Sequence, residues 1–420
     1  MQVWLTTDPV GFYSSLAAVD RKGNRGTRSY AATGYLKPNL GRANLKVLTS
    51  ALASKVIIDN GTATGVEFLH GGRTYRASAK REVILSAGTV QSPQLLELSG
   101  IGDRAILEQA GVQCIVDSPS CGANFEDHVL TGIGYDLKEG VISMDELQNE
   151  EYAAAQQKIY DETQEGPYGS PGMCMGFVSY ASLVSQQELD DTVALVRKVS
   201  TARTPFEKLQ EDILVEQLQD HTFANLQTFC IPCSLDVNAG SDQVKFFNPP
   251  PKGVNRVSLL ICLEHPFSRG SIHITSPDPT QAPRIDPGYF RNPVDAKILA
   301  AGIKWVDEVA KSKHLTKSLG QRWQPPPEQS LETEQDRIDM LTDHISTQYH
   351  LCGTVAMGEV VDARLRVKGV NGLRVVDASV FPAHGELPSS RLDNYSANGE
   401  LKSLEISWLQ RTPWLRRVQL

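Results

Sequence analysis

The sequence has no excess of basic residues and no long apolar run. Its 41 Lys and Arg residues stand against 49 Asp and Glu, which gives a formal net charge of -8 and a pI of about 5.7. Affinity for nucleic acid depends mainly on basic side chains that neutralise phosphates, so no nucleic-acid partner is expected. No uncharged apolar stretch approaches the roughly 18 residues that a bilayer span requires. A membrane partner is therefore not expected either.

The N-terminus also lacks the features of an export signal. Residues 1–9 contain neither a basic region nor a continuous apolar region. The sequence as written is predicted to be cytoplasmic, and secretion is expected only if a further N-terminal exon carries a signal peptide.

Cysteines are few for the chain length and odd in number. Seven are spread over 420 residues, a pattern that favours reduced thiols over a disulfide framework. Cys230 and Cys233 have the spacing of a redox or metal half-site, but no second Cys pair or His pair lies at zinc spacing. The two thiols are interpreted as small buried hydrophobic groups. No metal site is predicted.

The composition is that of a globular protein with more than one core. Hydrophobic residues make up 40% and charged residues 21%, which excludes a wholly disordered chain. The 420 residues exceed the roughly 250 to 300 at which a single core stops growing. Apolar spacing and turn residues predict strands at 44–58, 63–69, 73–78, 82–86, 271–275 and 373–376, and helices at 92–100, 104–110, 144–163, 187–218, 294–311 and 331–348.

The strand expected at 82–86 runs into a turn of two small residues, Ala87 and Gly88. Neither has a side chain that would keep a flat ligand from the backbone amides and carbonyls. On this segment alone, a tight strand-to-helix turn without a ligand is the simpler interpretation.

His350 follows an expected helix and precedes Gly353 and Thr354, where the chain changes direction. A side chain at such a break can project into a cleft. A lone histidine is more often a surface group or a satisfied core group, so this residue alone does not establish a reaction.

Four segments in order resemble a known family. They are Arg28-Ser-Tyr-Ala-Ala-Thr-Gly-Tyr-Leu36 with 44–49, the run 86–102 around Ser86-Ala-Gly-Thr-Val-Gln-Ser-Pro93, Pro266-Phe-Ser-Arg-Gly270 with 286–287, and Tyr349-His-Leu-Cys-Gly-Thr-Val-Ala-Met-Gly358 with 361–362, 373–379 and Pro382. Together they are similar to the glucose-methanol-choline (GMC) family of FAD-dependent oxidoreductases, and within it to the fungal alcohol oxidase and dehydrogenase branch. The resemblance extends over residues 26–382 and is loosest at 130–260.

The resemblance implies a fold of class α/β plus α+β. It consists of a partial Rossmann-like FAD-binding domain, with the first βαβ unit missing, and a substrate domain with an antiparallel sheet. The implied domains are residues 1–129 and 336–384 for the first and C-terminal parts of the FAD-binding domain, 130–335 for the substrate domain, and 385–420 for a divergent tail.

The resemblance also implies FAD as the cofactor and a small-molecule alcohol as the substrate, within fungal secondary metabolism. Ala53, through its backbone, and the turn Ala87 and Gly88 would contact the adenosine half of FAD. Asp377 and Ala378 would approach the pyrophosphate and ribityl chain. His350 would be the active-site base, which takes the hydroxyl proton while hydride passes to the flavin.

Two further histidines receive no chemical role. His128, at the end of Asn124-Phe-Glu-Asp-His128, matches a motif of the family and is interpreted as structural. His344 is expected on the solvated surface of the helix at 331–348.

The sequence departs from the family at two places. It contains no GxGxxG motif, which in the family holds the FAD pyrophosphate at a helix N-terminus. Eleven residues after Asp377, where the family has a second catalytic His or Asn, the sequence has Pro388. The match ends at about Gly385, and His384 is not expected to replace the missing group.

These departures leave two hypotheses. The first is a GMC-type FAD-dependent oxidoreductase that acts on an alcohol CH–OH group. The second is a truncated, catalytically inactive family remnant or a gene-model fragment, because loss of the phosphate clamp would weaken FAD binding by many orders of magnitude. A lyase or cyclase reaction on the same fold is a third, weaker alternative. The sequence does not distinguish an oxidase from a dehydrogenase and does not predict the oligomeric state.

Overall fold

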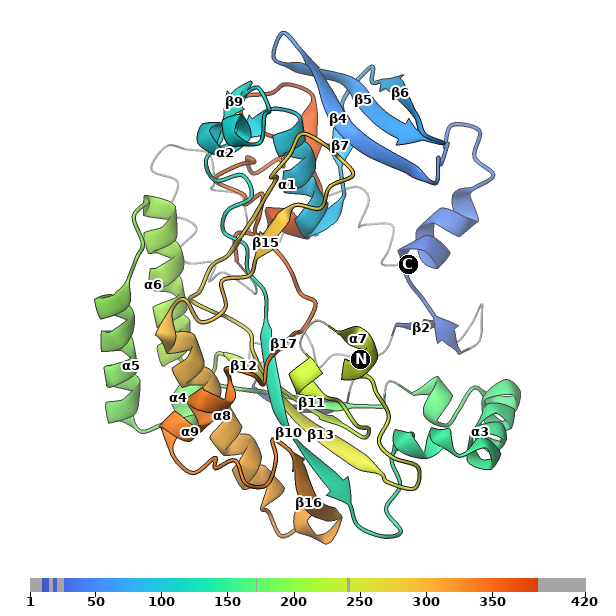
Figure 1. Ribbon diagram of the computed structural model, residues 1–420, viewed down its shortest axis with the longest axis vertical. Helices are drawn as coiled ribbons and strands as arrows, with labels where there is room; N and C mark the ends of the chain where they lie inside the picture. The colour runs from blue at the N-terminus through green and yellow to red at the C-terminus, as the bar shows by residue number, and fades with distance from the viewer. Residues whose placement is uncertain (1–9, 15–17, 21–25, 171, 240–241, 384–420) are drawn as a thin grey trace.

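The computed structural model of the chain describes residues 10–14, 18–20, 26–170, 172–239 and 242–383. The predictions for His384, Pro388 and the tail at 385–420 lie outside these residues. Figure 1 shows two lobes, a larger one built on an antiparallel sheet and a smaller one that contains the first long hairpin. In the smaller lobe, residues 83–85 pair with residues 373–375, from the last part of the described chain.

The larger lobe is built on an antiparallel sheet that has seven strands among the described residues. Strand β13 is buried at every position from Val257 to Leu263, as a run with almost no polar residues requires. The strand order is β1 (Gly11–Ser14), β11 (Cys174–Val178), β12 (Leu226–Ile231), β13 (Arg256–Leu263), β10 (Val129–Leu137) and β16 (Leu319–Gln324), and β17 (Ser346–Thr347) also pairs with β10.

Helices cover one face of this sheet. The long helix α8 (Pro293–Ala310) packs on β13 and β10 through Ile298, Ile303 and Val306, which are all buried. It begins where the sequence predicts, because the Asn292 side chain accepts a hydrogen bond from the Val294 N–H and caps the first turn. The same core includes residues of α4 (Tyr180–Leu183), α5 (Gln186–Val199), α6 (Pro205–Gln219) and α9 (Glu334–Met340).

The opposite face of the sheet carries a second apolar cluster. Side chains alternate between the two faces of a strand, so Leu260 and Cys262 both point to this side, and Leu130 on β10 joins them. The connection after β12 covers them with Leu235, Val237 and Phe246, from η6 (Val237–Ala239) and α7 (Gln243–Phe246).

The smaller lobe contains helix α1 (Gly88–Leu98) and several short sheets. Strands β4 (Ala51–Asp59), β5 (Thr62–His70) and β6 (Arg73–Ser78) form an antiparallel sheet, which confirms the predicted hairpin around Gly71 and Gly72. Strand β7 (Val83–Leu85) pairs in parallel with β18 (Leu373–Val375). This parallel pair places the residues that follow each strand at the same edge.

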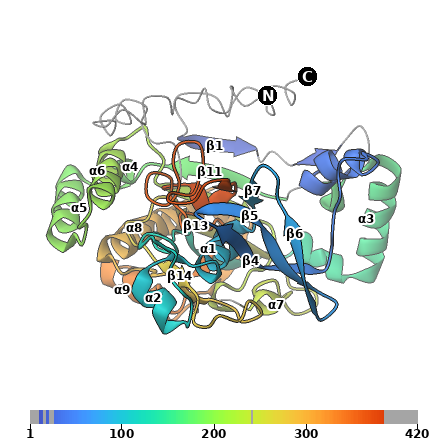
Figure 2. The ribbon, with the colours of Figure 1, turned by 90° about the horizontal axis from the view of Figure 1, so that it is seen from above.

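Short elements complete the described chain. Helix α2 (Arg104–Gln109) is capped by Asp103, and α3 (Glu150–Thr163) stands at the side of the molecule, away from α5 and α6, in Figure 2. The others are β2 (Val19–Asp20), β3 (Thr27–Arg28), η2 (Ala32–Leu36), η3 (Lys37–Asn39), β8 (Ile101–Gly102), β9 (Val116–Asp117), η4 (Met144–Gln148), η5 (Pro167–Gly169), β14 (Ser271–His273), β15 (Arg284–Asp286), η7 (Leu315–Lys317) and η8 (Ala378–Val380).

The structure corrects several predicted boundaries. The strand expected from residue 44 begins at Ala51. The single helix expected at 187–218 is the pair α5 and α6, because Thr204 and Glu207 form a capping box that starts a new helix. The helix expected at 331–348 ends at Met340, and a turn and strand β17 follow it.

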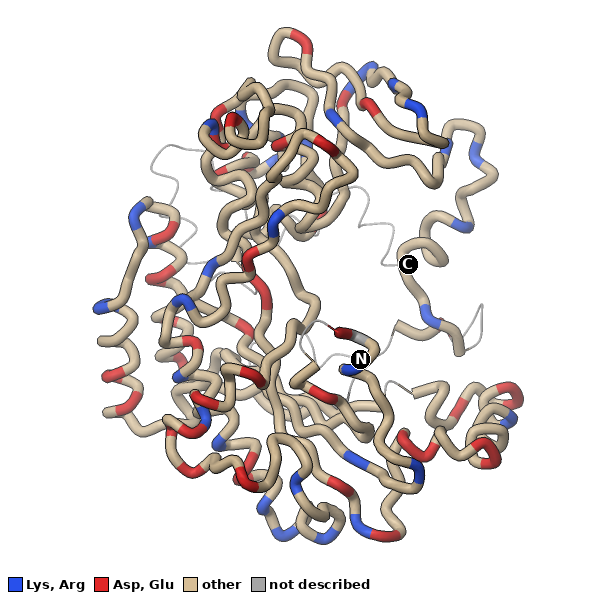
Figure 3. Tube along the Cα trace, in the orientation of Figure 1, with Lys and Arg blue, Asp and Glu red and all other residues tan. Residues whose placement is uncertain are grey.

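Basic and acidic residues are interspersed along both lobes in Figure 3. None of the helices in the described part of the chain is long and apolar enough to cross a membrane.

Candidate active site

The turn between β7 and α1 leaves its backbone open on one side. Gly88 has a φ of +83°, and a Cβ added there would meet nothing within 4 Å. The sequence predicted that this helix begins at Ser92, but helix α1 begins at Gly88. The Ser92 hydroxyl instead accepts a hydrogen bond from the Ala87 N–H at 3.2 Å and donates to Asp377.

The Asp377 carboxylate joins the ends of the two parallel strands. Its Oδ2 accepts hydrogen bonds from the Gly88 N–H at 3.0 Å and the Ser92 hydroxyl at 2.5 Å. Its Oδ1 accepts from the Ser379 N–H at 2.9 Å and the Ser379 hydroxyl at 2.5 Å. A carboxylate at the first turn of a helix is favourably placed, because the helix N-terminus is positive. Asp377 therefore holds the turn at Gly88 and the segment at Ala378 in one arrangement.

Removal of this carboxylate is expected to loosen the smaller lobe. Asp377→Ala deletes the acceptor of four hydrogen bonds and is expected to lower the free energy of unfolding by about 3 kcal/mol, since charged hydrogen bonds contribute roughly 1.5 to 3 kcal/mol each and partly exposed ones are replaced by water. Urea denaturation measures the change. Ser379→Ala removes one of the donors, so a loss of about 1 kcal/mol is expected for this control. Equal stability of Asp377→Ala and the unaltered chain would contradict this role.

Ala53 and Ala87, which the sequence implies for the adenosine half of FAD, line the same cavity. This cavity, of about 230 Å³, lies between β4 and α1, and its other walls include Leu52, Gln91 and Gln94. A second cavity of about 570 Å³ adjoins it, shares Ala87 and Gln94, and includes Gly88. Methyl side chains leave room for a flat ring here, and the Gln amides can donate or accept hydrogen bonds at its edge.

The segment that carries His350 is bound directly to the first turn of α1. The Thr89 hydroxyl donates to the Leu351 carbonyl at 2.8 Å, and the Thr354 hydroxyl donates to the Thr89 carbonyl at 2.7 Å. Thr354 is fully buried. These two hydrogen bonds place the residue after His350 within contact of the residue after Gly88.

The backbone at His350 is held in an unusual conformation. Tyr349 has a φ of +65°, in the left-handed region that a bulky residue rarely adopts. Gly353 has a φ of +91°, and a Cβ at this position would collide with the Asn124 carbonyl oxygen. Strain of this kind persists where surrounding contacts fix the chain, often at functional sites.

His128 lies against His350. Their Nδ1 atoms are 3.2 Å apart, and the ring centroids are 5.1 Å apart at an angle of 73°. The two segments meet because Glu126 and Cys352 exchange backbone hydrogen bonds of 3.1 and 2.9 Å. His128 is 5% exposed, whereas His350 is exposed. From the sequence, His128 was interpreted as structural, and its contact with His350 was not predicted.

A hydrogen bond between two imidazole nitrogens limits the protonation of the pair. One Nδ1 must donate and the other must accept, so at least one ring is neutral with its proton on Nε2. The His128 Nδ1 is also 3.5 Å from Glu264 Oε1. A nearby carboxylate favours the protonated state of an imidazole, so His128 can share or stabilise a proton that His350 accepts.

A layer of polar groups surrounds this pair. The Cys262 thiol donates to Gln348 Oε1, and the Gln348 amide donates to Gln227 Oε1, both at 2.7 Å. Burial, and then Glu264, raise the pKa of the Cys262 thiol well above its ordinary value. The Tyr289 hydroxyl donates to Asp127, and burial together with that carboxylate raises the pKa of Tyr289. Both groups are therefore neutral at neutral pH.

The prediction for His344 is wrong. This residue is 3% exposed rather than solvated, and its carbonyl accepts a hydrogen bond from the Thr131 hydroxyl at 2.5 Å. The expected helix ends before it, so the chain turns and carries the ring into the larger lobe. Burial lowers the pKa of His344.

The models of one protein family match two separate stretches of the chain. Models of the GMC oxidoreductase family match residues 11–130 with their N-terminal part and residues 266–389 with their C-terminal part. Together these regions cover more than half of the chain. The chain belongs to the GMC oxidoreductase family.

Curated GMC relatives match most of the chain. The dehydrogenase citC of Monascus ruber is 38% identical over 388 residues, which cover 89% of this chain and 62% of the relative. The patulin synthase of Penicillium expansum is 31% identical over 363 residues, which cover 84% of this chain and 54% of the relative. The chain thus spans less than two thirds of the length of these relatives.

Solved GMC structures confirm the predicted fold class, α/β plus α+β with an antiparallel substrate sheet. A fungal aryl-alcohol oxidase has a TM-score of 0.75 at 26% identity, over 91% of this chain and 64% of that chain. An FAD-dependent oxidoreductase from Chaetomium thermophilum has a TM-score of 0.77 at 24% identity, over 90% and 64%. Members of the family are FAD-dependent oxidoreductases, so FAD is the cofactor that the family implies.

The described residues fit the adenine end of FAD better than its pyrophosphate. The cavity that Ala53 and Ala87 share is also lined by apolar side chains, among them Leu52, and by two glutamine amides, groups that can pack on an adenine ring and bond to its edge. The open side of Gly88 admits a close backbone approach. The sequence contains no GxGxxG motif for the pyrophosphate. Of the cofactor residues that the resemblance implies, Ala53, Ala87 and Gly88 line these cavities, and Asp377 accepts a hydrogen bond from the Gly88 N–H.

Proposed function

We propose that the chain carries FAD and oxidises the CH–OH group of a small-molecule alcohol, with His350 as the base. The observation that carries this proposal is the pair of hydrogen bonds that join the segment after His350 to Thr89, next to the open turn at Gly88. They support a single groove that runs from Ala53 past Ala87 to His350. When bound, FAD would supply the acceptor for hydride.

His350 removes the proton from the substrate hydroxyl in this proposal. Imidazole is suited to this step because its ordinary pKa lies close to neutral pH. The contact with His128 orients the ring, and Glu264, 3.5 Å from the same His128 Nδ1, stabilises the positive charge that develops. Gln348 and Gln227 offer amide groups nearby that can bind polar atoms of the substrate.

The substrate class that we propose is an apolar alcohol, aromatic or alkyl, of fungal secondary metabolism. Gln227 on β12 pairs in register with Cys262 on β13, and Phe229 pairs with Leu260. Because side chains two residues apart on a strand point to the same face, Phe229 and Leu260 share the face of Gln227 and Cys262. Phe229 is half-buried and packs on the apolar cluster that contains Leu260, and its apolar surface favours an apolar ligand. The names of the fungal relatives, patulin synthase and dehydrogenase citC, and of the aryl-alcohol oxidase support this class.

Titration with FAD and anaerobic reduction test this function. The purified chain is expected to perturb the visible flavin absorption, and a benzylic or alkyl alcohol is then expected to bleach it without oxygen. The rival hypothesis of an inactive family remnant, which the absence of GxGxxG favours, predicts free-flavin spectra at every FAD concentration. Flavin that binds but is reduced by none of the alcohols would reject the alcohol reaction and leave cofactor binding in place.

The cavity walls allow a separate test of the cofactor site. Ala87→Leu is expected to raise the dissociation constant for FAD at least tenfold, because the larger side chain enters the cavity shared with Ala53. Ala87 is exposed, so the free energy of unfolding is expected to stay within about 0.5 kcal/mol of its original value. Flavin fluorescence measures the first quantity and urea denaturation the second. Thr62→Leu, on β5 outside these cavities, is a control for FAD affinity. Unchanged affinity in Ala87→Leu would place the adenine elsewhere.

A further inference from the structure

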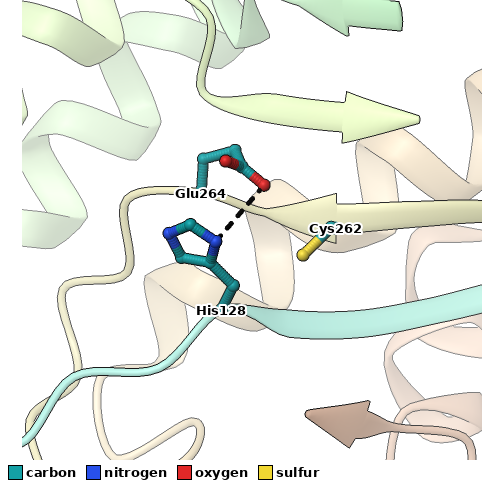
Figure 4. Close-up of side chains that lie close together, drawn as sticks. All are labelled: His128, Cys262 and Glu264. Carbon is teal, nitrogen blue, oxygen red and sulfur yellow. Dashed lines mark ion pairs between the residues drawn. The ribbon is translucent and has the colours of Figure 1, made fainter. Parts of the chain in front are cut away.

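Three side chains with ligand atoms for a metal ion converge at the end of two paired strands. They are His128, Cys262 and Glu264, and their ligand atoms all lie within 4.8 Å of one another. Figure 4 shows the three side chains turned toward one another, with the ion pair between His128 and Glu264. The sequence predicted no metal site, because no short spacing of His or Cys indicates one.

The geometry of the sheet produces this cluster. Cys262 and Glu264 are two residues apart at the end of β13, so both side chains point to the same face. Val129 pairs with Leu263 in register, which sets His128, the residue before Val129, opposite Glu264. Ligands that are 136 residues apart along the chain therefore meet without any local motif.

The distances and the donor types suit a zinc-class ion. Tetrahedral zinc with bonds of about 2.0 to 2.3 Å holds its ligand atoms about 3.3 to 3.6 Å apart. Of the three proposed ligands, whose ligand atoms lie within 4.8 Å of one another, one pair is already at this spacing, because the His128 Nδ1 is 3.5 Å from Glu264 Oε1. The His350 Nδ1 is 3.2 Å from the His128 Nδ1. One imidazole, one thiolate and one carboxylate form a mixed N, S and O set, which favours zinc over magnesium or calcium.

The three proposed ligands are buried, which favours binding of a single ion without its water shell over binding of a hydrated ion at the surface. His128 is 5% exposed, Cys262 is fully buried and the Glu264 side chain is 14% exposed. Displacement of water from such ligands is offset by bonds to the metal, whereas a surface carboxylate keeps its hydration. The Cys262 thiol donates a hydrogen bond to Gln348 Oε1. On binding, the S–H bond breaks, the proton leaves to solvent and the sulfur bonds to the ion with no change of oxidation state.

We propose that His128, Cys262 and Glu264 form a binding site for a zinc-class divalent cation, with its fourth position facing His350. An ion bound at this site would occupy the His128 nitrogen and block the His350 nitrogen, so that neither can transfer a proton. The inference adds to the proposed function an inhibitory cation at the same corner. Its test requires neither FAD nor turnover, so the failure of either proposal leaves the other standing.

Cobalt(II) is the probe for this site, because its spectrum reports both thiolate ligation and geometry. The chelator-treated chain without FAD is expected to bind one equivalent of Co²⁺, with a thiolate-to-cobalt charge-transfer band and the intense visible bands of a tetrahedral ion. One equivalent of Zn²⁺ is expected to remove both. Cys262→Ser is expected to lose the charge-transfer band and to bind Co²⁺ at least tenfold more weakly. Glu264→Gln is expected to keep the band but weaken binding, which covers the case in which Cys262→Ser does not fold.

Cys230→Ser is the matched control, because Cys230 lies on β12, pairs in register with Cys174 on β11 and is not one of the three proposed ligands. This variant is expected to leave the cobalt spectrum unchanged. The proposal is overturned if equimolar Co²⁺ produces no charge-transfer band. It is equally overturned if the band disappears in Cys230→Ser and persists in Cys262→Ser.

Discussion

Replacement of His350 by asparagine is expected to slow the reduction of bound flavin by an alcohol about 10²- to 10⁴-fold, the usual contribution of a positioned general base. Asparagine keeps a polar side chain of similar reach but cannot accept the hydroxyl proton. His350 is exposed and contributes little to either core, so the variant is expected to fold and to bind FAD as before. Anaerobic stopped-flow absorption at saturating alcohol measures the rate.

The pH dependence separates a base from a residue that only shapes the pocket. With His350 present, the rate of flavin reduction is expected to rise with pH as the imidazole loses its proton, and this rise is expected to disappear in His350→Asn. His314→Asn, at an exposed position on the larger lobe, is the matched control and is expected to leave the rate unchanged. A rate for His350→Asn within threefold of the original would remove His350 as the base.

Gly353→Ala is expected to produce a large loss of stability. The added methyl group collides with the Asn124 carbonyl, a backbone atom that cannot move aside, and alanine also disfavours a φ of +91°. A loss of about 3 kcal/mol or more in the free energy of unfolding is expected, enough to leave part of the chain unfolded. Urea denaturation and the soluble yield measure the effect.

Gly358→Ala separates collision from backbone strain. Gly358 has a φ of +95°, but an added Cβ there meets only the Phe206 ring, at 3.9 Å. This variant is expected to lose about 1 to 2 kcal/mol, the cost of the left-handed conformation for a residue with a Cβ. Equal losses in the two variants would mean that the Asn124 carbonyl gives way, and that the His350 segment is less rigidly held than the two hydrogen bonds to Thr89 require.

The sequence was sufficient for the parts of the site that depend on local pattern. Ala87 and Gly88 follow an apolar strand and precede a helix, and Asp377 follows another apolar strand, so the ends of two buried strands were visible before the structure. The parallel pairing of β7 and β18 then brings them together. Ala53 falls on a predicted strand, and the cavity that it shares with Ala87 follows from the packing of α1 on β4.

The sequence was not sufficient for contacts that depend on long-range register. His128 and His350 are 222 residues apart and meet through backbone bonds between Glu126 and Cys352, and no local spacing reports such a bridge. His344 was misplaced because the apolar spacing at 331–348 continues past Met340, where the helix ends. Asp377 has four internal hydrogen-bond donors, so its carboxylate also organises the backbone, a role that its position in a motif does not reveal.

Hydrogen exchange with mass spectrometry, with and without saturating FAD, tests the central claim most directly. If one groove holds the cofactor, FAD is expected to slow exchange in peptides that contain Ala53, Ala87–Thr89, Leu351–Thr354 and Asp377–Ser379, and to leave α3 and α5 unchanged. Slower exchange in the first two segments alone would restrict the site to the adenosine end. Protection confined to other segments, or none at any FAD concentration, would contradict a flavin site formed by these residues.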